Sequence, residues 1–305
     1  MKKIASLLAV LVFLFTGCNN QSEAKSDLSL CDSSLNDMFQ YLETKQDETD
    51  KLESFDYSND NITALLERLG TEGEGLNSIT VYSKNITDET ASQFIAVARQ
   101  NNIPVTFAMS EISSDILSVY DKAFSITTNY FHAAEEMAMR IKEMWTSGTI
   151  NDIDSNQIFT FSVIKSEYSD VYTELFYTHL TENMELYGIP MQINNILTPT
   201  ELESEDTLAE LRNNSEGFVV LADELLPYYA QYPPAGDGVE IITLQEGTTN
   251  TVKDYPFVAC CYIDYKNYKL VADEILDGFN EKEFPLDDVL FPYIERTVYI
   301  PATVI

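Results

Sequence analysis

Histidine, tryptophan and glycine are scarce in this chain of 305 residues, which contains two, one and eleven of them. Their scarcity argues against several enzyme classes, because zinc-protease helices need paired histidines, whereas nucleophile elbows and phosphate-binding loops need closely spaced glycines. Both histidines, His132 and His179, lie inside amphipathic runs, where a packed or surface role is usual. No catalytic constellation is visible, and we expect a protein that is not an enzyme.

Basic side chains are also few. Lysine and arginine together number 18 against 50 aspartates and glutamates, which gives a formal net charge of −32. Such a surface repels nucleic acid, whose phosphates demand basic side chains, and it resists binding flat on anionic lipid. Most of this charge is expected to be solvating, with a cationic ligand or bound cations as the alternative.

Cysteine occurs four times, and metal spacing such as C-x-x-C is absent. Cys31, Cys260 and Cys261 each end a short apolar run. Adjacent cysteines on a strand point to opposite faces, so at most one of Cys260 and Cys261 could face Cys31. We therefore expect these three to be buried free thiols.

The N-terminus has the pattern of a bacterial lipoprotein signal. Basic residues at positions 2 and 3 precede an apolar run of about a dozen residues, too short to span a membrane. The stretch "LFTGC" that ends at Cys18 resembles a lipobox with one extra residue, which implies that Cys18 is lipidated; an ordinary signal peptide is the alternative. We predict a signal peptide over 1–17, a flexible tether over 18–25, and a chain anchored at the extracytoplasmic face of the cell membrane.

Beyond the tether, short β-like runs alternate with amphipathic helical ones. "SITVYS" (78–83) followed by "DETASQFIAVARQN" (88–101) is typical, with an aspartate at the helix start and apolar residues three and four apart. The rhythm restarts near "IFTFSVIK" (158–165). It predicts an α/β protein with two doubly wound parallel-sheet lobes, in which ligands bind beyond the carboxyl ends of the strands.

One long segment carries a family resemblance. Residues 118–145 contain "YDKA", a strand that ends at Thr128, and a helix that closes on Trp145. This order resembles the type I periplasmic sugar-binding proteins of ABC transporters, most closely the galactose/glucose-binding group. Further matching segments are 98–111, 164–170 and 293–305.

The resemblance implies the periplasmic-binding-protein-like type I fold, with a hinge of three chain crossings. These crossings would lie near Thr128, near Ile263 and just after Pro285. The N-terminal lobe would comprise residues 26–127 plus 264–288, and the C-terminal lobe residues 128–263 plus 289–305.

Positions that read sugar hydroxyls in the family are mostly replaced here. The family's asparagine after the fourth strand corresponds to Met109 here. Its arginine corresponds to Glu174, so the N–H donors of a guanidinium are replaced by the two acceptor oxygens of a carboxylate. Either the pocket binds another polar ligand through local substitutes, or the ligand has been lost. The candidate ligand-binding residues are Ser33, Met109, Glu111, Tyr168, Asp170, Glu174, Asp223, Gln245 and Asp264, with Tyr172 and Tyr229 as further available aromatics.

The carboxylates among these candidates suggest an acidic pocket. Asp170, Glu174, Asp223 and Asp264 would favour a cationic or polyhydroxylated ligand. For each of them singly, a helix cap or a solvated strand end is the alternative.

A calcium loop, which the family also carries, has a partial counterpart. Asp152, Asp154 and Asn156 have the spacing of its first, third and fifth positions. The glycine that should follow is missing, and Ile158 arrives one residue early. The sequence leaves open a calcium site or an acidic surface loop, and it calls for no other cofactor.

Together these features predict a solute-binding lipoprotein of an ABC transporter, which holds a monosaccharide or a related small polar solute by lobe closure. Its partners would be a permease and, through the lipid, the membrane; the resemblance favours a monomer. The alternatives are a receptor-like sensor for a chemoreceptor or kinase, and a ligandless lipoprotein with a degenerate sugar site.

Overall fold

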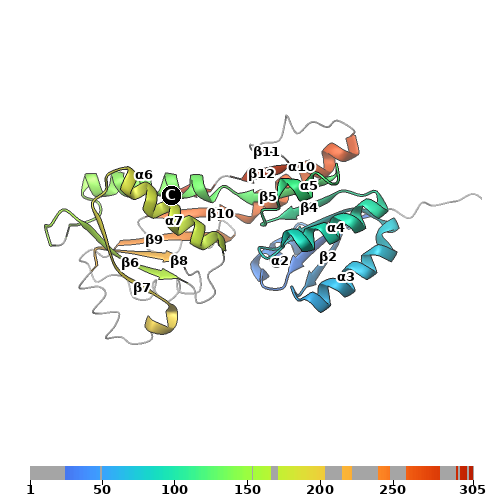
Figure 1. Cartoon of the computed structure of the whole chain (residues 1–305), viewed down its shortest axis with the longest axis horizontal. Coiled ribbons are helices and arrows are strands. Elements are labelled where there is room, and N and C mark those ends of the chain that lie inside the picture. Colours follow the sequence, from blue (N-terminus) through green and yellow to red (C-terminus); the bar gives the residue numbers. More distant parts are fainter. Residues whose placement is uncertain are drawn as a thin grey trace, which may run out of the picture.

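A computed structural model shows two α/β lobes that lie end to end along the long axis of the molecule (Figure 1). The predicted signal peptide, Cys18 and nearly all of the tether lie outside the described part. Within that part, no helix has the length and apolar character needed to cross a bilayer. The structure describes residues 25–48, 50–152, 154–165, 171–202, 215–221, 240–247, 259–281, 293–294, 296–300 and 302–304.

The sheet of the first lobe has seven strands, all parallel to their neighbours except at the β11–β12 edge. Its two central strands β4 and β5 are buried along their whole length, as expected for a parallel sheet covered on both faces. In sheet order the strands are β11 (Tyr293–Ile294), β12 (Thr297–Ile300), β5 (Ala123–Thr128), β4 (Val105–Ala108), β3 (Leu76–Tyr82), β1 (Ser26–Asp32) and β2 (Lys51–Phe55).

Helices cover both faces of this sheet, and alternation along the strands decides which residue meets which helix. Leu28 and Leu30 of β1 belong to the core that includes α3 and α4, whereas Cys31 of the same strand belongs to the core that includes α2 and α10. The helical segments of this lobe are α2 (Asn36–Glu43), α3 (Asn59–Glu72), η1 (Gly73–Gly75), α4 (Asp88–Asn101), α5 (Ser114–Leu117) and α10 (Tyr265–Glu281).

Helix α4 shows how local sequence sets an element's limits. The Thr87 hydroxyl caps its first turn by accepting a hydrogen bond from Thr90 N at 3.3 Å. The negative charge of Asp88 in the first turn interacts favourably with the positive end of the helix dipole. The helix ends where Asn102 takes the left-handed conformation with φ of 56°. The predicted helix over 88–101 is confirmed.

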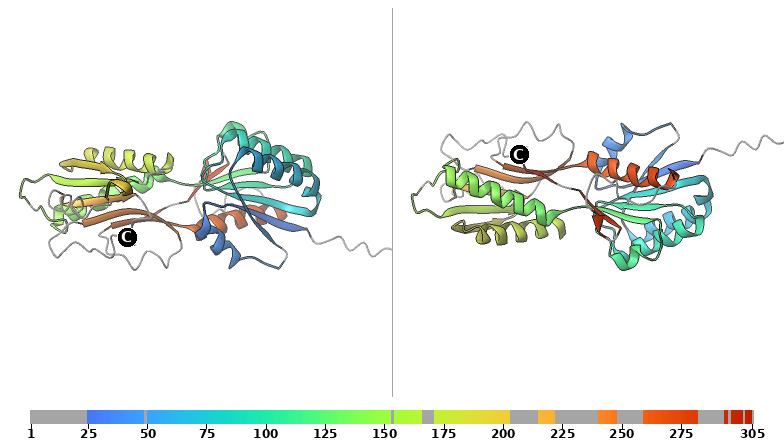
Figure 2. Two further views of the ribbon diagram at one scale, coloured as in Figure 1. Left: turned by 90° about the horizontal axis from the view of Figure 1, so that it is seen from below. Right: turned by 90° about the horizontal axis from the view of Figure 1, so that it is seen from above.

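The second lobe has a sheet of six strands, of which only the edge strand β13 is antiparallel to its neighbour. Helices α6 and α7 lie beside each other on one face (Figures 1 and 2). In sheet order the strands are β13 (Thr303–Val304), β10 (Ala259–Asp264), β9 (Glu240–Gly247), β8 (Gly217–Leu221), β6 (Phe159–Lys165) and β7 (Met191–Leu197); the helical segments are α6 (Tyr130–Ser147), α7 (Val171–Leu186) and η2 (Pro199–Leu202). The predicted architecture of two parallel-sheet lobes is confirmed.

Among the described residues, the chain passes between the lobes from β5 into α6, from β10 into α10, and from β12 to β13. The prediction that residues 289–305 all belong to the second lobe is wrong. Strand β12 pairs in parallel with β5 of the first sheet, and the third passage lies between Ile300 and Thr303, not just after Pro285. The hydroxyls of Thr128 and Tyr268 hydrogen-bond at 2.8 Å beside the first two passages.

The three described cysteines are buried thiols that form no disulfide within the described residues, as predicted. Burial raises the pKa of the Cys31 thiol to about 12, because its thiolate would lose hydration in the core. These thiols are therefore unreactive core residues.

Candidate ligand-binding cleft

The two lobes touch where parallel strands of both sheets end. The loop after β4 reaches the start of α7, because the backbone N–H of Glu111 donates a 2.8 Å hydrogen bond to Tyr172 Oη. The loop after β3 reaches the end of β9, because Lys84 forms an ion pair with Glu246. Carboxyl ends of parallel strands are where doubly wound sheets bind ligands, so these contacts locate the candidate cleft.

Glu246 is a buried carboxylate at this junction, with a side chain that is 6% exposed. Its Oε1 accepts a 2.7 Å hydrogen bond from Tyr130 Oη, while its Oε2 pairs with the Lys84 ammonium. Oε2 makes no hydrogen bond of good geometry within the described residues, so the Lys84 contact is chiefly one of charge. A buried carboxylate needs such a partner, because an isolated charge is strongly disfavoured away from water.

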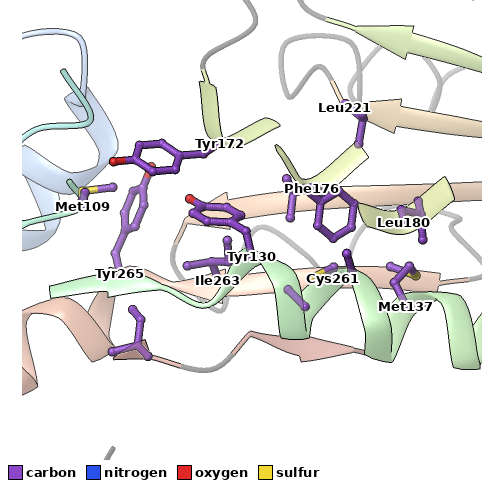
Figure 3. Packing of buried hydrophobic residues seen from close by; sticks show 14 of the residues in the cluster. Met109, Tyr130, Met137, Tyr172, Phe176, Leu180, Leu221, Cys261, Ile263 and Tyr265 are labelled. Atoms are coloured by element: carbon purple, nitrogen blue, oxygen red, sulfur yellow. The ribbon is translucent and has the colours of Figure 1, made fainter. Parts of the chain in front are cut away.

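Aromatic rings line the same junction. The rings of Tyr130 and Tyr172 stack with centroids 5.1 Å apart and an interplanar angle of 18°. Figure 3 shows Tyr265 and Met109 close to Tyr172, so that side chains of both lobes gather at one place. All four belong to one buried cluster. The junction thus packs flat apolar ring faces against one another beside phenolic hydroxyls.

Met109, one of the predicted ligand-binding residues, lies at this junction and contributes no polar side-chain group. Its backbone N–H donates a 2.8 Å hydrogen bond to Ile126 O, which continues the sheet beyond β4. The residue has a φ of 75°, a left-handed conformation that asparagine and glycine tolerate better than methionine. The side chain is 2% exposed and fills the junction with apolar atoms.

Glu111 also lies at the cleft, through its backbone contact with Tyr172 and a 3.5 Å approach of its Oε1 to Tyr299 Oη. Ser33 lies outside this contact region, in an exposed turn where its N–H donates to Phe55 O at 2.8 Å. Asp264 accepts a 2.9 Å hydrogen bond from Lys266 N at the start of α10, which agrees with the helix-cap alternative.

Glu174 forms an ion pair with Lys165 at 2.7 Å, and its side chain is 45% exposed. Lys165 in turn lies 4.2 Å from the centre of the Tyr177 ring. A carboxylate that already has a cation contributes less to an acidic pocket than the sequence predicts.

Gln245 lies on β9 directly before Glu246. Tyr168, Asp170, Asp223 and Tyr229 lie outside the described residues.

Three residues at the junction were not among the predicted site residues: Lys84, Tyr130 and Glu246. Glu246 directly follows the predicted Gln245, so a shift of one position in matching that strand end would have found it. Tyr130 lies inside the segment that resembles the family. Lys84 lies in none of the matching segments, and no sequence signal pointed to it.

Two of the three predicted calcium ligands come together with a third carboxylate. One oxygen each from Asp152, Asp154 and Glu216 lie within 4.8 Å of one another. Glu216 is buried just before β8 and accepts a 2.9 Å hydrogen bond from Thr160 N. Glu216 is far from Asp152 and Asp154 in the sequence, so the spacing pattern that predicted those two residues could not include it.

The rest of the loop around these carboxylates folds on itself. Asn156 Oδ1 accepts from Ile158 N at 2.6 Å, so this side chain serves the loop. Gln157 takes a φ of 63°, which supplies the sharp turn without the expected glycine. A set of hard carboxylate oxygens of this kind suits calcium.

Comparison with known proteins gives a likeness in structure only. No protein-family model matches the chain, and no curated protein matches its sequence. GanP, a glucose-galactose binding protein from Geobacillus stearothermophilus, has a TM-score of 0.60 at 12% identity, over 93% of this chain and 97% of that one. An ABC transporter periplasmic solute binding protein from Actinobacillus succinogenes with bound D-allose has 0.63 at 13%, over 92% and 97%.

The chain has the type I periplasmic-binding-protein fold. A putative LacI transcriptional regulator from Bacteroides fragilis also has it, with a TM-score of 0.59 at 12% identity, over 92% of this chain and 96% of that one. The fold therefore serves more than one function, and the residues of the cleft must decide between them.

Proposed function

We propose that this protein is an extracytoplasmic solute-binding lipoprotein of an ABC transporter, and that it holds a monosaccharide or related small polyol between its lobes. The observation that carries this proposal is the meeting of polar and aromatic side chains of both lobes at the carboxyl ends of their sheets. The ligand would stabilise the closed arrangement, because it contacts both lobes only when they approach.

The chemistry of the cleft supports a hydroxylated ligand. Each sugar hydroxyl both donates and accepts hydrogen bonds, so a site needs acceptors such as Glu246 and Glu111 as well as donors such as Lys84 and tyrosine hydroxyls. The faces of the rings of Tyr130, Tyr172 and Tyr265 suit the C–H faces of a pyranose. Solved structures of similar fold include proteins with bound D-allose, D-arabinose and D-fucose.

The net charge of the chain favours this proposal over a DNA-binding role for a protein with this fold. A net charge of −32 opposes binding to DNA phosphates, whose recognition depends on lysine and arginine. A lipid on Cys18 would instead hold the chain beside a permease in the membrane, as a monomer. A calcium ion held by Asp152, Asp154 and Glu216 would brace the second lobe.

A thermal-shift screen tests the proposal. The full chain carrying Cys18→Ser would be heated with monosaccharides, polyols, nucleosides and polyamines in turn. A ligand at a hundred times its Kd adds about 2.7 kcal/mol to the free energy of unfolding, which raises the Tm by roughly 5 °C for a chain of this size. A rise with a sugar or polyol supports the proposal, a rise only with polyamines supports the cationic-ligand alternative, and no rise with any class supports the ligandless alternative.

A further inference from the structure

The contact between Lys84 and Glu246 joins the two lobes directly, side chain to side chain. Lys84 follows β3 of the first lobe, and Glu246 lies at the end of β9 of the second. Their side chains are 20% and 6% exposed, so the pair is largely shielded from water and salt.

The loop that carries Lys84 is held firmly on both sides of the lysine. Ser83 Oγ and Asn85 Nδ2 both donate to Asp32 Oδ2, at 2.8 and 3.3 Å, and the Asp32 side chain is buried. Ser110 Oγ donates to Ser83 O, which ties the loop to the end of β4. These bonds fix the backbone at Lys84, so little conformational freedom is lost when its ammonium meets Glu246.

The acceptor is held equally well. Tyr130 donates to Glu246 Oε1 at 2.7 Å, and its ring stacks on Tyr172. Tyr172 Oη in turn accepts from Glu111 N of the first lobe, so a second bond crosses the cleft beside the ion pair. Both partners are therefore positioned before they meet, which favours the contact itself.

We propose that the Lys84 ammonium holds the two lobes together in the absence of ligand. It does so because it neutralises the Glu246 carboxylate when closure of the lobes buries that carboxylate. In a chain that carries so many carboxylates the lobes repel each other, and Lys84 supplies attraction where the strand ends meet. A solute must then separate the pair and replace the ammonium with donors of its own. This last consequence rests on the proposed function, whereas closure without ligand does not.

The distance between the lobes tests the proposal directly. Spin labels would be attached to Gln100→Cys on α4 and Glu185→Cys on α7, both exposed, in the full chain carrying Cys18→Ser. The described cysteines are buried and stay unlabelled. Interlobe distances are then measured by pulsed electron paramagnetic resonance, with no solute added.

We expect a short distance in the parent protein and in Lys84→Arg, which keeps the charge. Lys84→Met and Glu246→Gln should lower the ratio of closed to open molecules about tenfold or more, and the double variant should open no further. Lys45→Met, on an exposed loop of the first lobe, is the matched control and should leave the distance unchanged. In Lys84→Ala, propylammonium should restore the short distance, whereas in Glu246→Gln it should not.

The proposal is overturned if Lys84→Met and Glu246→Gln keep the parent distance, or if Lys45→Met opens the lobes equally. Because no solute is present, such a result would leave sugar binding untouched. Conversely, if no compound in the thermal-shift screen raises the Tm but Lys84→Met and Glu246→Gln open the lobes as expected, only the proposed function is refuted.

Discussion

Replacing Met109 with alanine and with glycine tests whether the backbone at the end of β4 is strained. Met109 has a φ of 75° and a side chain that is only 2% exposed. Truncation to alanine removes buried atoms and should lower the free energy of unfolding by about 3 kcal/mol. Alanine keeps its Cβ, so it relieves none of the strain.

Glycine at the same position loses the same packing but relieves the left-handed conformation, which costs an L-residue roughly 1–2 kcal/mol. Against this, glycine gains backbone entropy in the unfolded state worth roughly 0.5–1 kcal/mol. Met109→Gly should therefore be more stable than Met109→Ala by about 0.5–1 kcal/mol.

Met38 on α2 provides the matched control, because it is equally buried in the same lobe but helical. There glycine should be about 1 kcal/mol less stable than alanine. The sign of the difference between glycine and alanine should thus reverse between the two sites, as measured by urea unfolding of the full chain followed by circular dichroism. If glycine is the less stable residue at position 109 too, the inference of backbone strain is refuted.

Three further changes have definite expected outcomes. Thr87→Ala removes the cap of α4 and should lower the free energy of unfolding by about 1 kcal/mol in urea titrations, whereas Thr87→Ser should not. Calcium should raise the Tm of the parent protein, and this rise should be lost in Glu216→Gln; an equal rise in both would place the ion elsewhere. Because burial raises the pKa of Cys31 to about 12, the unfolded thiol ionises first as the pH rises above about 9. Stability should therefore fall between pH 9 and 12, and Cys31→Ala should show a shallower fall in unfolding titrations across that range.

The fold could be predicted because its signals are local. Each helix of the first lobe follows a strand and has its own start, as Thr87 and Asp88 show for α4. The place of β12 could not be predicted in this way, because its partner β5 is far away in the chain and only tertiary packing decides between the two sheets.

The cleft was only partly predictable for the same reason. Met109 and Glu111 were predicted because they follow a recognisable strand. Glu174 was identified by position, but its neutralisation by Lys165 depends on where two side chains lie in space. The pairing of Lys84 with Glu246 joins different lobes, so no pattern along the chain could indicate it.

We expect a small polar solute to bind between the lobes at Glu246. Isothermal titration calorimetry with the sugar or polyol that gives the largest rise in Tm tests it most directly. Lys84→Met is the reference protein, since its ion pair is already absent; adding Glu246→Gln then removes the carboxylate charge that faces the solute and Tyr130. We predict one solute per chain in the reference, and an affinity at least roughly tenfold weaker after Glu246→Gln, because a hydrogen bond to a charged group is lost. Equal affinities in the two proteins would contradict the account.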